Sequence, residues 1–384
     1  MKRANGDGSI YLTKDGRWTA RVQLGKTNNG KPKIKAFYGK TKTEVTRKLR
    51  EFQKQDFLST ESSKQSFSEY LHNWLVLYKE RSLRATSFDR LEGIVQHVVE
   101  PYFKYINLSQ VSCDHIQKFF MELQDKGYAY ATLEKIKHLL NGCFKHALAR
   151  NDIRRNPMVE LIMPSKETFV CKEIVFLNEE DIGKFTRSAT EKYLSGEPVY
   201  RYGYGLVFMM YTGLRLGEAL ALKKSDIDCE NKTVTVNKNT VIIKNRHDEG
   251  NNYIVKTHKP KTKTGVRTVY LCQTALNALE ELCKITNIVD NDSFIFSTTT
   301  GKAASKRNIQ RTVQSIASKS QLSIPYCNVH TLRHTFASML FRKKIDVKTI
   351  SVLLGHSNVN FTYNRYIHLL EEQKHLAVAL LDSL

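Results

Sequence analysis

The sequence predicts a multidomain α+β protein in which three folded parts follow one another along the chain. Three patterns indicate this: basic strands and turns over residues 1–56, helical periodicity over 66–163, and a helix–strand–helix succession over 174–384. A chain of 384 residues is long enough for two or three domains. We therefore expect a small three-stranded sheet plus helix, then an all-α helical bundle, then a mixed, mainly helical domain with a small antiparallel sheet.

The net charge of +22 is unusually high and narrows the class of partner. It favours a polyanion, most commonly nucleic acid, although a membrane-surface protein can carry such charge too. No apolar run approaches the roughly 20 residues that cross a bilayer, and the N-terminus lacks an apolar signal segment. The seven cysteines are scattered without a C-x-x-C pair, which argues against a disulfide framework or a zinc site. We expect a cytoplasmic protein without membrane contact.

The first part, residues 1–56, is predicted to be a small sheet backed by one helix. Thr41 is a candidate N-cap for a helix over residues 42–53, with Val45 and Leu49 facing inward. Short strands separated by Gly- and Asn-containing turns are expected at residues 9–12, 17–24 and 33–38.

This first part is also a candidate DNA-binding domain. Residues 1–55 hold fifteen Lys and Arg against four Asp and Glu, so +11 of the net charge lies there. A three-stranded sheet can place its strands in a DNA major groove. The alternative is a solvated basic tail, which the regular strand pattern argues against. The candidate DNA contacts are Arg17, Trp18, Arg21, Lys33 and Lys35.

The second part, residues 66–163, has apolar residues at helical spacing throughout. Polar, serine-rich residues 56–66 precede it and residues 164–172 follow it, which is typical of linkers. Four helices are expected, starting near Phe67, at residues 86–100 with Thr86 as N-cap, near residues 114–123, and over residues 133–147.

The third part, residues 174–384, is expected to begin with a helix that Asn178 caps and to contain strands within residues 233–271. Residues 240–258 are predicted to form a β-hairpin. The tail, residues 370–384, has an apolar stripe at helical spacing, which docks either on its own domain or on a neighbouring protomer.

Two motifs in the third part concentrate residues suited to phosphate. In Y-T-G-L-R-L-G-E, an apolar helix ends at a glycine and Arg215 opens the next helix. In H-T-L-R-H-T-F-A-S, His330 lies three residues before Arg333, so both side chains can reach one anionic group. A Leu-Gly-His turn then provides His356, and Tyr366 follows ten residues later. Arginine suits this task because its planar fork binds phosphate oxygens bidentately.

This order of motifs resembles the tyrosine recombinase (phage integrase) family, in particular an integrase of a conjugative element or temperate phage. The resemblance spans all three parts and is most specific over residues 175–368. It implies an arm-site DNA-binding domain (1–56), a core-binding, SAM-like helical domain (66–163) and a tyrosine recombinase catalytic domain with a C-terminal tail helix (174–384).

The resemblance also implies roles for the motif residues. Tyr366 is the expected nucleophile, because Tyr363 falls short of the family's spacing after the Leu-Gly-His turn. Arg215 and Arg333 are expected to hold the phosphate, with Glu218 orienting the first of them. His330 would transfer a proton or hold a phosphate oxygen, and His356 would contact the phosphate or place the tyrosine.

The resemblance further implies that a lysine in P-K-T-K-T-G-V-R-T-V, a predicted hairpin turn, protonates the leaving oxygen. Lys263 is the candidate, with Lys261 and Lys259 as alternatives. A zinc site on His330 and His334, four residues apart, is disfavoured because no H-E-x-x-H motif is present and Arg333 repels a cation.

The implied function is site-specific DNA integration and excision of a mobile element, by transposition or viral genome integration, through a covalent 3′-phosphotyrosine. The implied partners are double-stranded DNA at core and arm attachment sites, three further protomers in a homotetramer, and accessory bending or excision proteins. No cofactor and no metal are expected, and the location is the bacterial cytoplasm, on DNA. The alternatives are a type IB topoisomerase-like enzyme and a binding-only DNA regulator.

Overall fold

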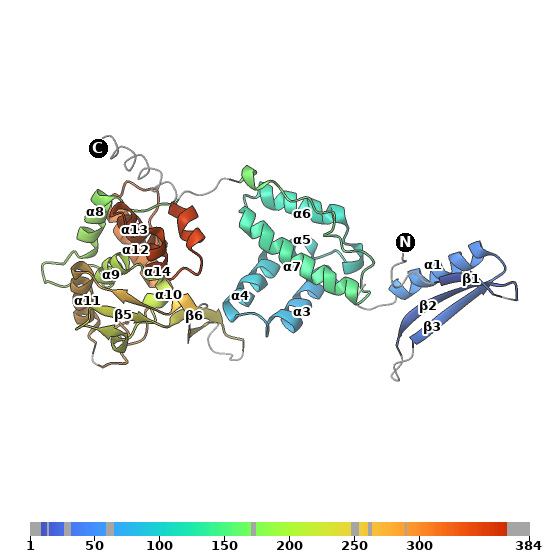
Figure 1. The fold of residues 1–384 in the computed structure, drawn as a ribbon, viewed down its shortest axis with the longest axis horizontal. Helices are drawn as coiled ribbons and strands as arrows, with labels where there is room; N and C mark the ends of the chain where they lie inside the picture. Colours follow the sequence, from blue (N-terminus) through green and yellow to red (C-terminus); the bar gives the residue numbers. More distant parts are fainter. Residues whose placement is uncertain are drawn as a thin grey trace, which may run out of the picture. The chain divides into compact units, whose positions relative to one another are not determined.

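The structure is a computed structural model that describes residues 9–13, 15–26, 32–58, 65–169, 174–246, 253–259, 263–288 and 290–366. The chain divides into two compact units, Met1–Val170 and Cys171–Leu384, whose elements are labelled in Figure 1. The predicted fold class is confirmed: a sheet with one helix, a helical bundle, and a mainly helical part with small antiparallel sheets follow in that order. Within the described residues, no helix is both long enough and apolar enough to span a bilayer.

The N-terminal sheet is antiparallel in the order β1-β2-β3. Ala20 and Val22 of the middle strand are buried in one cluster with Val45 and Leu49 of the helix, as the sequence predicts. Thr41 accepts the predicted capping bond, 3.2 Å from the Glu44 amide. The helix runs five residues beyond the predicted end because no Gly or Pro interrupts it. The elements are β1 (Ser9–Leu12), β2 (Trp18–Lys26), β3 (Pro32–Gly39) and α1 (Lys42–Leu58).

The helical bundle has an aromatic core built from the predicted apolar faces. Phe67 of the first helix stacks on Phe144 of the last, with ring centroids 4.7 Å apart. The elements are α3 (Phe67–Lys79), α4 (Ala85–Ile94), the π-helix η1 (Val95–Val99), α5 (Glu100–Phe103), the 3₁₀ turn η2 (Leu108–Gln110), α6 (Cys113–Asp125), α7 (Tyr130–Ala149) and the 3₁₀ turn η3 (Lys166–Thr168).

The second helix of the bundle differs from its prediction at both ends. Thr86 is not its N-cap, since α4 begins at Ala85 and the carbonyl of Arg84 accepts the first helical bonds. The helix then passes through η1, where the Glu100 amide bonds the Val95 carbonyl five residues back. Pro101 lacks an N–H and its ring crowds the preceding turn, which favours this wider turn over a regular one.

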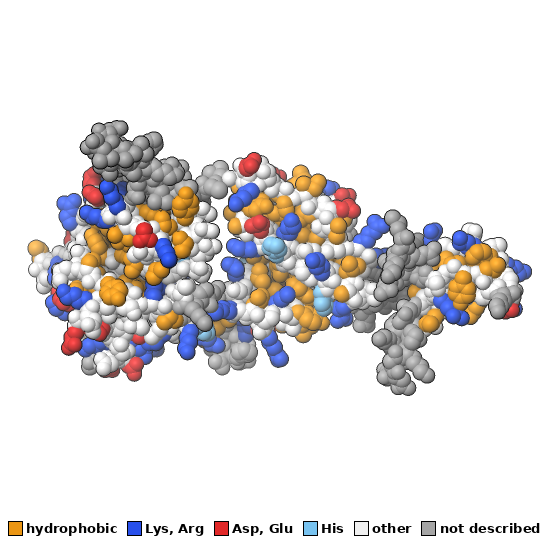
Figure 2. Space-filling view, viewed as in Figure 1, with side chains coloured by type: hydrophobic (Ala, Val, Ile, Leu, Met, Phe, Trp, Pro, Cys, Tyr) orange, Lys and Arg blue, Asp and Glu red, His pale blue; other side chains and the backbone are white. Residues whose placement is uncertain are grey.

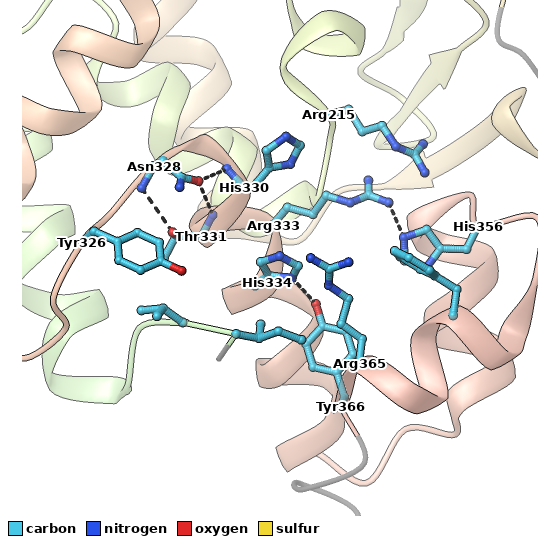
Figure 3. A pocket seen from close by; sticks show the side chains of 13 residues that line it. Arg215, Tyr326, Asn328, His330, Thr331, Arg333, His334, His356, Arg365 and Tyr366 are labelled. Atoms are coloured by element: carbon cyan, nitrogen blue, oxygen red, sulfur yellow. Dashed lines mark hydrogen bonds between the residues drawn. The ribbon is translucent and has the colours of Figure 1, made fainter. Parts of the chain in front are cut away.

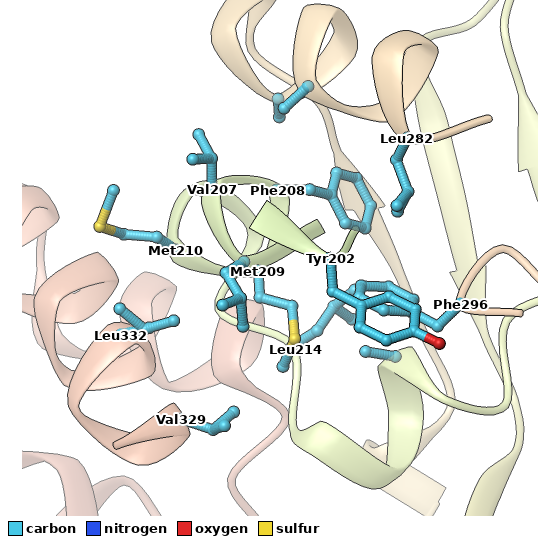
Figure 4. Packing of buried hydrophobic residues seen from close by; sticks show 14 of the residues in the cluster. Tyr202, Val207, Phe208, Met209, Met210, Leu214, Leu282, Phe296, Val329 and Leu332 are labelled. Carbon is cyan, nitrogen blue, oxygen red and sulfur yellow. The ribbon is translucent and has the colours of Figure 1, made fainter. Parts of the chain in front are cut away.

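The C-terminal unit is built around α9, which is apolar on nearly all sides and buried. Figure 4 shows its side chains meeting Leu282 of α11 and Leu332 of α13. Asn178 caps α8 as predicted, 2.7 Å from the Asp181 amide. The helices are α8 (Glu179–Ala189), α9 (Gly203–Thr212), α10 (Leu216–Ala219), α11 (Gln273–Thr286), α12 (Lys306–Ser320), α13 (Val329–Arg342) and α14 (Val347–Leu354), with the 3₁₀ turns η4 (Lys224–Asp226) and η5 (Lys263–Gly265).

Two small antiparallel sheets complete this unit. One has the order β4-β5-β8 and the other is the predicted hairpin, β6-β7, whose turn at residues 247–252 lies outside the described residues. The segment that carries Lys263 is not the predicted hairpin turn, because β7 before it pairs with β6 and β8 after it pairs with β5. The predicted tail helix also lies outside the described residues. The strands are β4 (Ile227–Asp228), β5 (Thr233–Val236), β6 (Asn239–Lys244), β7 (Tyr253–His258) and β8 (Arg267–Tyr270).

Candidate active site

A pocket of about 420 Å³ in the C-terminal unit brings five motif residues together (Figure 3). Among the described residues, three arginines and three histidines line it, and none of the thirteen lining side chains is Asp or Glu. Such a lining favours an anion, because its charged side chains are all cationic. The motif residues in it are Arg215, His330, Arg333, His356 and Tyr366; the others are Ile174, Val175, Tyr326, Asn328, Thr331, His334, Phe361 and Arg365.

Arg215 lies where α9 ends and α10 begins. Gly213 ends α9 with φ +63°, and a Cβ there would meet the Phe336 ring at 2.5 Å, so glycine suits both the backbone and the space. Arg215 is the N-cap of α10, and its guanidinium pairs with Glu218 at 2.8 Å. The Arg215 amide also donates to Glu218, at 2.9 Å. The structure therefore contains the contact by which Glu218 was expected to orient Arg215.

Arg267, which the sequence analysis did not single out, completes this arrangement. Its guanidinium donates to both Glu218 oxygens, at 2.9 and 3.2 Å, and its Nε donates to the Leu353 carbonyl at 2.8 Å. Burial opposes the charged carboxylate, yet the hydrogen bonds and charges of Arg267 and then Arg215 hold the Glu218 pKa below its ordinary value. Glu218 therefore ties the Arg215 turn to β8. No local sequence signal indicates this pairing, because the partners are 49 residues apart.

His330 and Arg333 both project into the pocket from the first turns of α13 (Figure 3). Asn328 starts this helix by accepting hydrogen bonds from the amides of His330 and Thr331, at 2.8 and 3.1 Å. Burial, followed by the charge of Arg333, lowers the pKa of His330, so its ring is neutral near pH 7.

Arg333 is almost fully buried and is held by two helix ends. It donates to the carbonyl of Gly213, after α9, and to that of Leu354, at the end of α14, both at 2.6 Å. Helix C-termini carry partial negative charge and stabilise a cation there. Burial and the charge of Arg215 lower the pKa of Arg333 to about 9, so it remains a cation near neutral pH.

His356 follows Gly355, which ends α14 in the left-handed region with φ +65°. Its Nε2 lies 3.0 Å from Arg333 Nη2, and its Nδ1 lies 2.7 Å from Thr362 Oγ1. Arginine can only donate, so Nε2 is the acceptor and Nδ1 carries the proton. Burial, followed by Arg333 and Arg215, lowers the pKa of His356 to about 3, so the ring is neutral.

Tyr366 lies on a helix that begins at residue 359 and is only 1% exposed. Its hydroxyl lies 2.6 Å from Nδ1 of His334 (Figure 3). Burial lowers the pKa of His334 to about 4, so its neutral ring can accept the phenolic proton. Burial raises the pKa of Tyr366, against the charges of Arg333 and Arg365. The sequence suggested His334 only as a zinc ligand, and this contact to the tyrosine was missed.

Tyr363 and the lysine candidates are placed differently. Tyr363 is 39% exposed and does not line the pocket. The Lys263 side chain lies outside the described residues, but its backbone belongs to η5. A Cβ on Gly355 would come within 3.0 Å of the Thr264 carbonyl, so η5 lies against the turn that leads to His356. Lys259 is exposed and does not line the pocket, and Lys261 lies outside the described residues.

Two of the five candidate DNA contacts lie on the face of the N-terminal sheet that carries α1. Lys35 pairs with the buried Val22 across the strands, and its ammonium lies 3.9 Å from the Phe52 ring centroid of α1. Trp18 alternates with the same buried strand residues, and Lys42 of α1 lies over its ring. Residues that pair directly in an antiparallel sheet share a face, so Trp18 and Lys35 belong to the covered face.

Arg21 lies on the opposite face of this sheet. It pairs with Ser9 and Ala36, is exposed, and lies over the Tyr11 ring at 5.6 Å from the centroid. Arg17 is exposed just before β2, and the Lys33 side chain lies outside the described residues. The five predicted contacts therefore do not form one surface.

Comparisons with known proteins agree with this geometry. A model of the "Phage integrase family" matches residues 176–373, and one of the "Phage integrase, N-terminal SAM-like domain" matches residues 66–124. The chain is 30% identical to a "Tyrosine recombinase XerC-like" protein of Caldanaerobacter subterraneus subsp. tengcongensis, over 94% of this chain and 95% of that protein. It is 26% identical to "Prophage ps2 probable integrase" of Lactococcus lactis subsp. lactis, over 85% of each. The fold resembles the Tn1549 transposon integrase solved in complex with transposon right end DNA, with TM-score 0.64 and 21% identity, over 82% of this chain and 100% of that one.

Proposed function

The chain belongs to the phage integrase family of tyrosine recombinases, and from this premise we propose how its own residues cut and rejoin DNA. Members of this family are site-specific recombinases that transfer DNA strands. The observation that carries the proposal is the pocket in which Arg215, Arg333, two motif histidines and Tyr366 meet, and whose described lining residues include no carboxylate. A DNA phosphate is the anion that fits it. The substrate is double-stranded DNA at the core site of a mobile element, which the chain integrates and excises.

The reaction is an in-line displacement at phosphorus. A bond forms between the Tyr366 oxygen and phosphorus, and the bond from phosphorus to the 5′-oxygen of the next nucleotide breaks. His334, 2.6 Å from the hydroxyl, is the nearest base for the phenolic proton. Lys263 gives a proton to the departing 5′-oxygen. The bond energy is kept in the 3′-phosphotyrosine, so a 5′-hydroxyl from another strand can reverse the step without ATP.

Arg215 and Arg333 stabilise the charge that grows on the non-bridging oxygens. Both guanidiniums are fixed before DNA arrives, Arg215 by Glu218 and Arg333 by two helix ends. Preorganised charges of this kind need no rearrangement in the transition state. His330 and His356 are neutral in the free protein, and a bound phosphate would raise their pKa values toward proton uptake. They act as phosphate ligands or proton carriers.

The rest of the chain delivers DNA to this pocket. We assign residues 1–56 to arm-site binding, 66–163 to core binding and 174–384 to catalysis. Figure 2 shows Lys and Arg side chains spread over the face in view, consistent with the net charge of +22. Within residues 1–56, the face of the sheet opposite α1, which carries Arg21, is the one that meets DNA. A homotetramer on DNA, accessory bending or excision proteins, and a location on DNA in the bacterial cytoplasm complete the proposal.

A covalent-trapping assay tests this function. The full chain is incubated in EDTA, without ATP, with nicked duplexes from the ends of its element, so that the short 5′-hydroxyl fragment diffuses away. After denaturation, wild type and Tyr363→Phe give a protein–DNA adduct, whereas Tyr366→Phe gives none and binds DNA within about threefold of wild type. An adduct in Tyr366→Phe moves the nucleophile elsewhere. Binding without any adduct in wild type favours a DNA regulator that only binds.

A second measurement separates recombination from topoisomerase activity. Strand exchange between two labelled duplexes that carry the same core sequence is expected of a recombinase. Relaxation of a supercoiled circle without exchange between the duplexes would instead support a type IB topoisomerase-like enzyme.

A further inference from the structure

Arg365 is a cation of the pocket that the motifs of the sequence did not single out. It precedes Tyr366 on the same helix and is one of the three arginines that line the pocket. Figure 3 shows its guanidinium beside the Tyr366 hydroxyl, on the side that faces Arg333. Its charge is one of two that pull the pKa of Tyr366 down against the effect of burial.

Within the part of the chain that the structure describes, the donors of Arg365 have no partner, in contrast to those of the other two arginines. Arg333 donates to two backbone carbonyls, and Arg215 donates to Glu218 and to the Gly355 carbonyl. Among the described residues, Arg365 makes no hydrogen bond or ion pair, and its Nε is buried without a partner. A guanidinium has five N–H donors, and a buried donor such as this Nε–H costs free energy when it has no partner. An anion in the pocket would satisfy them.

Two aromatic contacts in series hold the Arg365 guanidinium in position. It lies over the Phe361 ring, 5.0 Å from the centroid, and Phe361 in turn meets the His356 ring edge-on at 5.0 Å. Phe361 lies one turn before Arg365 on the same helix, so this contact directs the long side chain along the helix and over the pocket. The side chain is thus preorganised, and none of the described residues takes up its donors.

We propose that Arg365 is a third phosphate-binding arginine, which donates to a non-bridging oxygen of the phosphate that Tyr366 attacks. This inference rests on the proposed function. Arg365 is attached next to the nucleophile, so the two side chains approach the phosphate together. Its charge stabilises both the phenolate that forms and the pentacoordinate transition state. It accepts and releases no proton.

The rate of adduct formation in a single turnover tests the proposal, with full-length chains and a duplex on which wild type forms an adduct. Arg365→Gln should slow the step by about 10²-fold, a typical loss for one donor to a developing oxyanion, and Arg365→Lys by less. Arg342→Gln is the matched control, because Arg342 also lies over a phenylalanine, Phe176, but does not line the pocket. It should stay within about twofold of wild type. Thermal unfolding verifies that each variant is folded.

A DNA substrate with an uncharged group at the attacked position distinguishes a phosphate contact of Arg365 from a purely structural role. When a methylphosphonate replaces the attacked phosphate, one charged non-bridging oxygen is absent, and the deficit of Arg365→Gln relative to wild type should shrink to less than about tenfold in one stereoisomer. An equal deficit on both substrates, or equal rates for wild type and Arg365→Gln on natural DNA, overturns the proposal for Arg365 alone. Absence of an adduct with wild type overturns the proposed function, and this inference with it.

Discussion

The phenolic oxygen of Tyr366 lies 2.6 Å from Nδ1 of His334, one turn beyond His330 on α13. The two residues are 32 positions apart in the chain and belong to different helices. The contact holds the hydroxyl in a site from which water is nearly excluded, since Tyr366 is 1% exposed. It also gives the phenol a neutral acceptor, because burial keeps the His334 ring unprotonated.

The hydrogen bond between His334 and Tyr366 should be measurable as a coupling free energy of unfolding. Tyr366→Phe removes the hydroxyl, and His334→Ala leaves that buried hydroxyl without an acceptor, which costs about 1–3 kcal/mol of stability. A double-mutant cycle from denaturant unfolding should give a coupling free energy of about 0.5–1.5 kcal/mol. Additive losses would show that the hydrogen bond contributes nothing to the folded state.

Glu218 should be needed for both stability and the rate of adduct formation. Glu218→Gln leaves Arg267 buried without its counter-charge, and the loss of one partner of a buried pair costs about 3–5 kcal/mol. Unfolding in urea measures this loss. Asp226→Asn is the matched control, because Asp226 is also buried but pairs with Lys238, which is 36% exposed. Its loss should be near 1 kcal/mol or below. Equal losses in the two variants would contradict the role given to Glu218.

The free protein should lose stability as the pH falls below about 6.5. His334 and His356 have folded pKa values lowered to about 4 and about 3, so the unfolded chain binds more protons below pH 6.5. Stability is therefore full above pH 6.5 and falls until the pH reaches those values. The slope is at most about 1.4 kcal/mol per pH unit for each ring, and less here because solvent screens half-buried groups. Melting curves from pH 7 to pH 5 should show a falling Tm.

A histidine variant identifies which groups cause the loss of stability at low pH. His356→Asn removes one of the histidines whose folded pKa is lowered, so its Tm should fall less steeply between pH 7 and pH 5 than that of wild type. Parallel falls in the two proteins would assign the pH dependence to other groups.

The two faces of the N-terminal sheet should respond differently to loss of charge. If Arg21 contacts a phosphate, Arg21→Gln should reduce the slope of log K against log salt concentration by about 0.9, for arm-site DNA. Lys35→Gln is the matched control, because the Lys35 ammonium lies over Phe52 on the face that α1 covers. Its slope should match wild type. A larger change for Lys35 than for Arg21 would place DNA on the other face.

Local sequence patterns predict much of the fold and of the candidate site. Helix caps such as Thr41 and Asn178, and apolar spacing in α3 and α7, depend on residues three or four positions apart, and these predictions were confirmed. The pocket residues Arg215, His330, Arg333, His356 and Tyr366 belong to short motifs, and the structure brings all five together as expected.

Tertiary contacts decided the rest. The pairing of Arg267 with Glu218, and of His334 with Tyr366, joins residues whose spacing carries no periodic signal. The same holds for β7 and β8, which flank Lys263 but pair with different strands. The start of the second bundle helix at Ala85, in place of a Thr86 cap, was set by backbone bonds to the Arg84 carbonyl. Local sequence determined which residues can bind phosphate, since that depends on side-chain type and helix period. The tertiary structure decided which of them face one another, because burial and pairing across the chain fix side chains that local sequence leaves free.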